Sequence, residues 1–306
     1  MKVFHSLKGF KAKNPVLTIG TFDGVHIGHQ VILSRLKEVA NEIDGEVTLL
    51  TFHPHPRLVL HPEQKDLLML NTQNEKIKLL ERYGVDIILF QPFTLEFSRL
   101  AYDAFVKQII VDGIKAKKVV IGYDHHFGHN REGGLKQLQL LSALHHFDVE
   151  EIPEQDIDYA AVSSSRVRKA LLAGDVHSAN QLLGHHYSIS GKVVKGKQLG
   201  RSLGFPTANL EIEPFKLIPC NGIYAVKVAI DKKLYNGMLS IGHRPTFDNG
   251  ERSIEVNILD FYGDLYGTAL TVDLHHYIRR ELKFESAGDL IAQMQKDKLM
   301  TLKLFS

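Results

Sequence analysis

The sequence predicts an α/β domain with a parallel sheet, followed by a small antiparallel β-barrel domain with a C-terminal helix. In the first half, short apolar runs of strand length alternate with segments whose apolar residues recur at helical spacing. After residue 184 the apolar residues recur at every second position, in short runs separated by glycine, proline, asparagine and aspartate. We therefore expect two domains, residues 1–184 and 185–306, each long enough to bury its own core.

The first domain shows strand-like runs, each followed by a segment of helical length. The expected strands are residues 16–19, 47–52, 86–90 and 118–121, and the expected helices are residues 31–40, 75–83 and 101–111. Two further short helices are expected within residues 163–184, separated by Gly174 and Asp175. This alternation is typical of a parallel sheet with helices on its faces.

The second domain shows strand periodicity and a final helix. The expected strands are residues 188–194, 223–230, 234–241, 253–261 and 269–277. Ser286, with Asp289 three residues later, predicts the N-terminal cap of the final helix, whose apolar residues recur at helical spacing.

Composition excludes several classes of protein. A net charge of +2 does not indicate a nucleic-acid-binding module. Cys220 is the single cysteine, which excludes an intramolecular disulfide and a thiolate zinc cluster and fits a reducing compartment. Neither a signal-like start nor an apolar run long enough for a membrane span is present in the sequence. We expect a cytoplasmic protein with small-molecule substrates and no membrane or nucleic-acid partner, and leave a homo-oligomer open.

The densest motif, Gly20 to His29, lies between an expected strand and an expected helix. Glycines allow a tight turn, and the helix that follows points unpaired N–H groups and its positive dipole end outward, which predicts an anion site. His26 and His29 lie three residues apart, so both imidazoles can face one side and donate to phosphate oxygens. The string His26-Ile-Gly-His29 resembles the signature of the nucleotidyl-transferring α/β superfamily, which includes the class I aminoacyl-tRNA synthetases.

Two other interpretations of the histidines stay open at this point. The pairs His26/His29 and His53/His55 have spacings that metal ligands use, so a metal-dependent hydrolase is the alternative function. A non-catalytic RNA-binding relative of the synthetases is a third hypothesis, against which the weak net charge argues.

A second phosphate motif opens the helix expected after residue 163. Serines before an apolar-periodic run are good N-terminal caps, and capping alone explains Ser164 and Ser165. Their hydroxyls, the exposed amides and Arg168 also suit a second phosphate clamp. Capping and clamping are compatible.

The β-rich half carries its own candidate site. Gly200, Arg201 and Gly204 indicate a loop able to fold over phosphates. Thr207 and Asn209, two apart in an extended segment, face the same way and offer the hard oxygen ligands that Mg²⁺ prefers, although a simple turn explains the same letters.

The strand expected over 253–261 places its apolar residues on one face and Glu255 and Asn257 on the other. Such a polar face is usually only solvated. A carboxylate fixed on a strand is also the expected general base for a phosphoryl transfer to an alcohol.

Residues 1–306 resemble the bacterial bifunctional riboflavin kinase and FMN adenylyltransferase family, also called FAD synthetase. The resemblance rests on these strings: Gly20 to His29, Thr51 to Pro56, Gly122 to Gly128, Ser163 to Arg168, Gly200 to Asn209, Ile241 to Phe247, Glu255 to Phe261, Asp264 to Gly267, and Arg279 to Phe284.

For the first domain the resemblance implies a Rossmann-like nucleotidyltransferase that converts FMN and ATP to FAD and pyrophosphate with Mg²⁺. It implies His26 and His29 as catalytic contacts to the ATP phosphates. It implies further ATP-binding residues at Gly20, Phe22, Asp23, Gly24, Ser164, Ser165 and Arg168, and flavin-binding residues at Phe52, Pro54, Pro56, Asp124 and Phe127. Ser165 replaces the usual Thr, and His125 replaces a common Phe.

For the second domain the resemblance implies a riboflavin kinase that uses ATP. It implies Glu255 as the catalytic base, Thr207 and Asn209 as magnesium ligands, and Arg279 as a flavin-binding residue. It implies that Gly200, Arg201 and Gly204 bind ATP. Asn257 replaces a common His.

Overall fold

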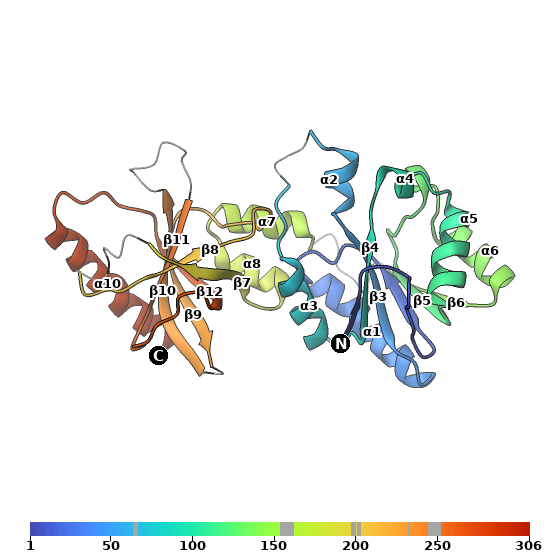
Figure 1. Cartoon of the computed structure of the whole chain (residues 1–306), viewed down its shortest axis with the longest axis horizontal. Helices are drawn as coiled ribbons and strands as arrows, with labels where there is room; N and C mark the ends of the chain where they lie inside the picture. The colour runs from blue at the N-terminus through green and yellow to red at the C-terminus, as the bar shows by residue number, and fades with distance from the viewer. Residues whose placement is uncertain (64–66, 154–161, 197–199, 201–202, 232, 244–251) are drawn as a thin grey trace. The chain divides into compact units, whose positions relative to one another are not determined.

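The computed structural model describes residues 1–63, 67–153, 162–196, 200, 203–231, 233–243 and 252–306. The chain forms two compact units, Met1–Ser163 and Ser164–Ser306. Figure 1 labels many of their elements. The helices on either side of Gly174 thus belong to the second unit, whereas the sequence analysis put them at the end of the first domain. The functional boundary at 184/185 stays a prediction.

The first unit contains a six-stranded parallel sheet in the order β1-β4-β3-β2-β5-β6. The strands are β1 (Lys2–Phe4), β2 (Val16–Ile19), β3 (Val47–His53), β4 (Ile87–Pro92), β5 (Lys118–Gly122) and β6 (Asp148–Ile152). The helices are α1 (Ile27–Glu42), α2 (Pro56–Leu60), α3 (Gln73–Arg82), α4 (Leu95–Ser98), α5 (Tyr102–Phe105), the π-helix η1 (Val106–Ile114), the 3₁₀ turn η2 (His129–Arg131) and α6 (Leu135–His145).

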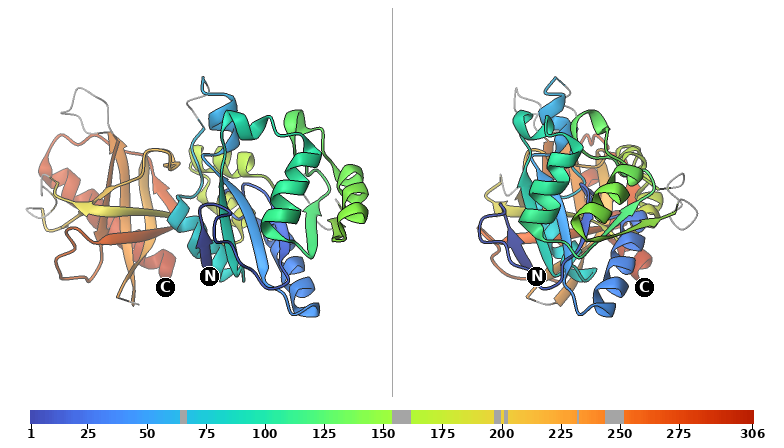
Figure 2. Two further views of the ribbon diagram at one scale, coloured as in Figure 1. Left: turned by 45° about the vertical axis from the view of Figure 1, so that its right-hand side comes forward. Right: turned by 90° about the vertical axis from the view of Figure 1, so that its right-hand side faces the viewer.

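Helices cover both faces of this sheet, and each face has its own apolar core (Figure 2). Alternate strand residues divide between them: Val16 and Leu49 join α1 and α3 in one core. Leu17 and Leu50 join α5, η1 and α6 in the other. Strands buried on both faces explain the continuous apolar runs seen in the sequence and confirm the predicted parallel sheet.

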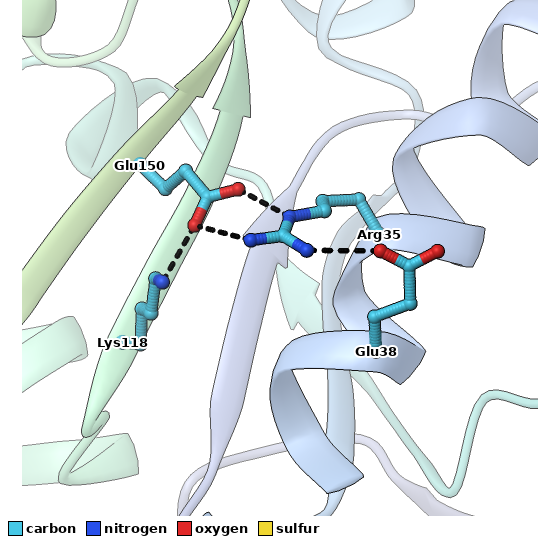
Figure 3. Close-up of polar contacts among 4 residues, drawn as sticks. All are labelled: Arg35, Glu38, Lys118 and Glu150. Carbon is cyan, nitrogen blue, oxygen red and sulfur yellow. Dashed lines mark hydrogen bonds and ion pairs between the residues drawn. The ribbon is translucent and has the colours of Figure 1, made fainter. Parts of the chain in front are cut away.

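A charged network fastens α1 to the strands β5 and β6 (Figure 3). Arg35 of α1 donates from Nε and Nη2 to the two carboxylate oxygens of Glu150, at 2.5 and 3.3 Å, and from Nη1 to Glu38 at 2.9 Å. Lys118 Nζ lies 2.5 Å from Glu150 Oε2. Hydrogen bonds from Arg35 and Lys118 hold the pKa of Glu150 below its ordinary value.

The second unit contains a closed antiparallel barrel in the order β10-β11-β8-β7-β12-β9. Its strands are β7 (Tyr187–Val194), β8 (Ala208–Glu211), β9 (Gly222–Ile230), β10 (Lys233–His243), β11 (Arg252–Ile258) and β12 (Ala269–Arg279). Val226, Leu239, Val256 and Val272 are fully buried. Closure pairs both edges of the sheet, so alternation along each strand separates the interior from the outer face.

Two helices pack on this barrel, α8 (Val176–Leu183) and α10 (Ala287–Phe305), and α7 (Ser164–Leu172) packs on α8. Asn180 ties α8 down, because its Nδ2 donates to Leu274 O at 2.9 Å and its Oδ1 accepts from Tyr187 N at 2.8 Å. Ser286 caps α10 as predicted, since its hydroxyl accepts from Asp289 N at 3.1 Å. None of the helices among the described residues combines the length and apolar character that a membrane crossing requires.

Three short strands, the helices α2, α4 and α6, and the form of one further helix were not predicted from the sequence. β1, β6 and β8 are three to five residues long, and β6 reads Asp-Val-Glu-Glu-Ile because it forms an edge of the sheet. The helix expected over 101–111 is α5 continued by a π-helix to Ile114, a hydrogen-bonding pattern that apolar periodicity does not specify.

Candidate active sites

The first unit has a cavity of about 570 Å³ at the carboxyl ends of its parallel strands. Gly20 follows β2, Gly122 ends β5, and both line the cavity. The chain runs outward from β2 to β3 and β4 on one side and through β5 to β6 on the other, so the cavity lies at the topological switch point of the sheet. This is where open α/β sheets bind their ligands.

The N-terminus of α1 places His26 and His29 beside this cavity. His26 is the N-cap: its Nδ1 accepts a long hydrogen bond of 3.4 Å from His29 N. The two imidazoles stack with their centroids 3.7 Å apart, and Phe22 stacks on His29 at 4.5 Å. Because Nδ1 of His26 accepts, the proton of a neutral His26 ring lies on Nε2.

Both histidines are uncharged at neutral pH. Burial lowers the pKa of His26 to about 4, although Asp23 opposes the shift. Burial, with His26 and Lys76 nearby, also holds the pKa of His29 well below its usual value. The pair therefore offers N–H donors to a phosphate rather than formal positive charge.

A buried loop at Leu70 and Asn71 is hydrogen-bonded to the Gly20–His29 motif. Asp23, 1% exposed, accepts from Leu70 N at 3.0 Å and from Asn71 N at 3.3 Å, and Asn71 Oδ1 accepts from Gly24 N at 2.7 Å. These bonds use Asp23 to anchor the turn; a direct ATP contact for Asp23 and Gly24 stays a prediction.

Lys76 of α3 contacts the same turn, a residue not predicted from the sequence. Its Nζ donates to Thr21 O at 2.7 Å. Burial lowers the pKa of Lys76, and Asp23 opposes the shift. A capping box, in which Thr72 and Glu75 bond each other's backbone N–H, fixes the start of α3. This Thr-x-x-Glu pattern was the sequence signal that could have predicted where the helix carrying Lys76 begins.

Aromatic rings form another part of the cavity lining. Phe52 at the end of β3 and Phe127 after β5 line it as predicted flavin-binding residues, together with Pro56 and Asp124. Phe93, Phe97 and Phe105 line it too and were missed. The spacing of Phe93 and Phe97, four residues apart after β4, was the sequence signal that could have predicted an aromatic lining there. The rings lie edge to face, with Phe93 and Phe97 centroids 5.7 Å apart.

His125 adds a polar group to this aromatic lining. Its ring is nearly parallel to that of Phe127, with centroids 6.1 Å apart. Burial, with His126 and Arg131 nearby, lowers the pKa of His125 to about 4. Among the described residues, its Nε2 has no hydrogen-bond partner.

The geometry does not favour the metal interpretation of the histidine pairs. His26 and His29 stack face to face instead of pointing their nitrogens at one point. His55 is the N-cap of α2, where its Nδ1 accepts from Arg57 N at 3.2 Å. Within the part of the chain that is described, no three His, Cys, Asp or Glu side chains form a group that could hold a metal ion.

Ser164, Ser165 and Arg168 lie at the start of α7, which belongs to the second compact unit. Their action as a phosphate clamp for the first site stays a prediction. Pro54 lies between β3 and α2, and its flavin contact stays a prediction too.

In the second unit, Glu255, Thr207 and Asn209 come together across two antiparallel strands. Glu255 of β11 lies opposite Asn209 of β8, which places both side chains on one face. Thr207 Oγ1 donates to Glu255 Oε2 at 3.0 Å. Gly196 lies so close to the buried Asn209 amide that a β-carbon there would be 2.2 Å from its nitrogen.

Two cavities meet at Thr207. One, of about 240 Å³, lies under α10 and is lined by Thr207, Glu255, Asn257, Arg279 and residues of α10. The other, of about 630 Å³, is lined by Pro206, Thr207 and the segment from Phe261 to Tyr266. The Thr207–Glu255 pair thus lies where two ligands in adjacent cavities would meet.

Arg279 lines the smaller cavity with its guanidinium already paired. Its Nε and Nη2 donate to the two oxygens of Asp297 on α10, at 2.9 and 2.6 Å. Gln293 Nε2 also donates to Asp297, at 2.9 Å. Asp297 was missed, because nothing in its helix distinguishes a buried aspartate from solvated ones. The pair fastens α10 to β12 at the lining of this cavity.

The loop around Gly200, Arg201 and Gly204, which the sequence predicts to bind ATP phosphates, is described only in part. Gly200 O accepts from Leu203 N at 3.2 Å and from Phe205 N at 2.8 Å. Gly204 has a φ of +81°, a conformation that favours glycine. Arg201 lies outside the described residues.

Each half of the chain matches a known protein family. A family model described as FAD synthetase matches residues 10–166, and one described as riboflavin kinase matches residues 183–305. The chain is 38% identical to the bifunctional riboflavin kinase/FMN adenylyltransferase of Listeria monocytogenes, over 96% of this chain and 93% of that protein. It is 36% identical to the Bacillus subtilis protein of the same name, over 99% and 96%.

A solved structure is similar along the whole chain. The crystal structure of a protein named as a macrolide-efflux protein, from Streptococcus pneumoniae, is 31% identical with a TM-score of 0.86. The alignment covers 98% of this chain and 97% of that one.

Proposed function

Because the chain belongs to the bifunctional riboflavin kinase/FMN adenylyltransferase family, we propose that its barrel phosphorylates riboflavin to FMN and its α/β domain converts FMN to FAD. Both family models match this one chain, so both activities belong to it. The carrying observation is that residues of the two sets of motifs line separate cavities in separate compact units: Gly20, His29 and Phe127 in the first unit, and Thr207, Glu255 and Arg279 in the second.

In the α/β domain, a phosphate oxygen of FMN attacks the α-phosphorus of ATP. The new P–O bond gives FAD, and the bond to the β-phosphate breaks to release pyrophosphate. The N-terminus of α1, with N–H groups of the neutral His26 and His29, receives the triphosphate and stabilises the charge that develops on its oxygens. The wall of phenylalanines offers rings on which the flavin stacks.

In the barrel, the terminal ribityl hydroxyl of riboflavin attacks the γ-phosphorus of ATP, and ADP leaves. Glu255 takes the proton of that hydroxyl as general base. A carboxylate that accepts one bond from Thr207 keeps acceptor capacity for the alcohol. Riboflavin occupies the cavity under α10, beside Arg279, and ATP occupies the adjoining cavity. Contacts of Gly200, Arg201 and Gly204 with the ATP phosphates stay a prediction from the sequence.

Mg²⁺ fits the oxygen donors at the junction of these cavities. Thr207 offers a hydroxyl, Asn209 a carboxamide oxygen and Glu255 a carboxylate, all hard ligands on one strand face. We propose that Thr207 and Asn209 hold the ion, which would neutralise charge on the transferring phosphoryl group. The proposal also includes a magnesium ion in the first site, a cytoplasmic location and the absence of nucleic-acid partners; a homo-oligomer stays open.

Flavin chromatography tests the proposal directly. The purified full chain is incubated with riboflavin, ATP and Mg²⁺, and separately with FMN in place of riboflavin. We expect FMN and then FAD from the first mixture and FAD from the second. Unchanged riboflavin and FMN would overturn the proposal, and zinc, iron or manganese held in stoichiometric amount through dialysis would favour the metal-dependent hydrolase instead.

A further inference from the structure

Asn257 is a buried amide in the riboflavin kinase half to which no role has been given so far. It lies on β11 two residues after Glu255, so the two side chains share a strand face. On the neighbouring strand β10, Ser240 lies opposite Glu255 and Met238 opposite Asn257. All four residues line the cavity under α10, and Asn257 is 6% exposed.

One end of the Asn257 amide fixes the segment that carries Thr207. Its Nδ2 donates to Pro206 O at 2.7 Å, and the next residue, Thr207, donates to Glu255 Oε2 at 3.0 Å. The assignment of the nitrogen is unambiguous because a proline carbonyl can only accept. Two consecutive residues are thus bound to one strand face, which holds the Thr207 hydroxyl against the general base.

The other end of the amide has no partner. Among the described residues, no donor reaches Asn257 Oδ1, although the atom is buried. An unpaired buried acceptor lowers the stability of a fold, and most such atoms in native proteins are paired. A ligand with a hydroxyl in this cavity would supply the missing donor.

We propose that Asn257 positions both the catalytic pair and the substrate: Nδ2 holds Thr207 against Glu255 through Pro206, and Oδ1 accepts a hydrogen bond from a secondary hydroxyl of the ribityl chain. The inference rests on the proposed riboflavin kinase function. Glu255 and Asn257 are about 7 Å apart along the strand. A polyol laid along this face therefore presents its terminal hydroxyl to Glu255 and an inner hydroxyl to Asn257.

The test combines variants with riboflavin analogues that each lack one secondary ribityl hydroxyl. Steady-state FMN formation by the full chain is measured first with riboflavin, and no FMN at that point overturns the proposed function itself. With an active wild type, we expect one analogue to raise KM by about 2–10-fold, the worth of a neutral hydrogen bond.

Asn257→Leu and Asn257→Asp separate the two ends of the amide. Asn257→Leu removes both bonds, so it raises KM for riboflavin by the same factor, no longer distinguishes riboflavin from that analogue, and lowers kcat. Asn257→Asp keeps an acceptor but sets a carboxylate oxygen against Pro206 O, so it lowers kcat while preference for riboflavin over the analogue survives. Ser253→Ala, on the same strand and outside both cavity linings, is the matched control and keeps wild-type constants.

Two results overturn the inference while the proposed function stands. One is a wild type whose KM is the same for riboflavin and every analogue, a measurement that requires no variant to fold. The other is an Asn257→Leu enzyme that discriminates among the analogues as the wild type does. Circular dichroism melting of each variant checks the barrel, and conversion of FMN to FAD checks the α/β domain.

Discussion

The two candidate sites differ in how the chain assembles them. In the α/β domain, one strand-to-helix junction supplies Gly20, Phe22, His26 and His29, and the sheet merely presents that junction at its edge. In the barrel, the site draws Thr207 from before β8, Glu255 from β11 and Arg279 from β12. A local motif builds the first site, whereas strand register builds the second.

The sites also differ in electrostatics. Buried, uncharged imidazoles characterise the first, since desolvation lowers the pKa values of His26 and His29. Carboxylates and a guanidinium characterise the second, where Arg279 and Asp297 form a partly buried ion pair. Substitutions should therefore reduce the activity of one half without the other, and for different physical reasons.

The largest difference between the two reactions, FMN formation and FAD formation, is expected from Glu255→Gln. Removal of a general base costs typically about 10²–10⁴-fold in rate, so FMN formation should fall by that factor while conversion of FMN to FAD stays within twofold of wild type. Flavin chromatography with each substrate alone measures both. A parallel fall in the two reactions would show that the division of labour is wrong.

His29→Ala should produce the opposite result. Loss of one donor at a developing charge costs about 10²–10³-fold, so FAD formation should fall by that factor and FMN formation should not change. His145→Ala, on α6 and outside the cavity lining, is the matched control. Equal loss in His29→Ala and His145→Ala would remove the histidine motif from the mechanism.

Asp297→Asn should weaken the barrel half alone. Breaking a fully buried ion pair by removing one partner costs about 3–5 kcal/mol. The Arg279 side chain is 17% exposed here, so we expect a loss below that range. Thermal unfolding should shift downward and KM for riboflavin should rise. The double variant Arg279→Met/Asp297→Leu should recover the stability but not the KM; recovery of both would exclude Arg279 from flavin binding.

Acid should destabilise the α/β domain through its buried histidines. The pKa of His26 is about 4 in the folded chain and 6.5 in the reference state, so the unfolded chain binds more protons between these values. Stability is therefore lost as pH falls from about 6.5 toward 4, by up to about 3 kcal/mol for this group. Urea unfolding at several pH values measures the slope.

His26→Gln should reduce that pH slope, and the lowered pKa values of His29 and His125 account for the part that remains. The same pH series is compared with one for a variant of His275 in the barrel, because burial also lowers the pKa of His275 to about 4. A wild-type slope in His26→Gln would mean that His26 is not neutral in the folded chain.

The smallest effect is expected in the network of Figure 3. Glu150→Gln removes the carboxylate that Arg35 and Lys118 share. The Glu150 side chain is 25% exposed, and the substitution should lower the free energy of unfolding by about 1 kcal/mol. Glu38→Gln removes a partner that is 59% exposed and should cost about 0.3 kcal/mol. Chemical denaturation distinguishes the two, and equal costs would show that partial burial does not strengthen the network.

Much of the protein follows from its sequence alone. The apolar runs at 16–19 and 47–52 and the two-residue alternation of β11 appear at the predicted places, because burial of one or two faces imposes a period on the chain. The Gly20–His29 motif predicts its own site because its parts are neighbours along the chain. The cap at Ser286 was equally readable, since a cap and its helix are adjacent.

Only the tertiary structure decided the rest. Strands β1 and β6 are edge strands too short and too polar to show a period, and their pairing with β4 and β5 depends on the rest of the sheet. Lys76 at Thr21, Asp297 at Arg279 and Asn257 at Pro206 join residues distant in sequence. Such contacts are set by strand register and helix docking, which depend on how the whole core packs and leave no periodic signal in any one segment.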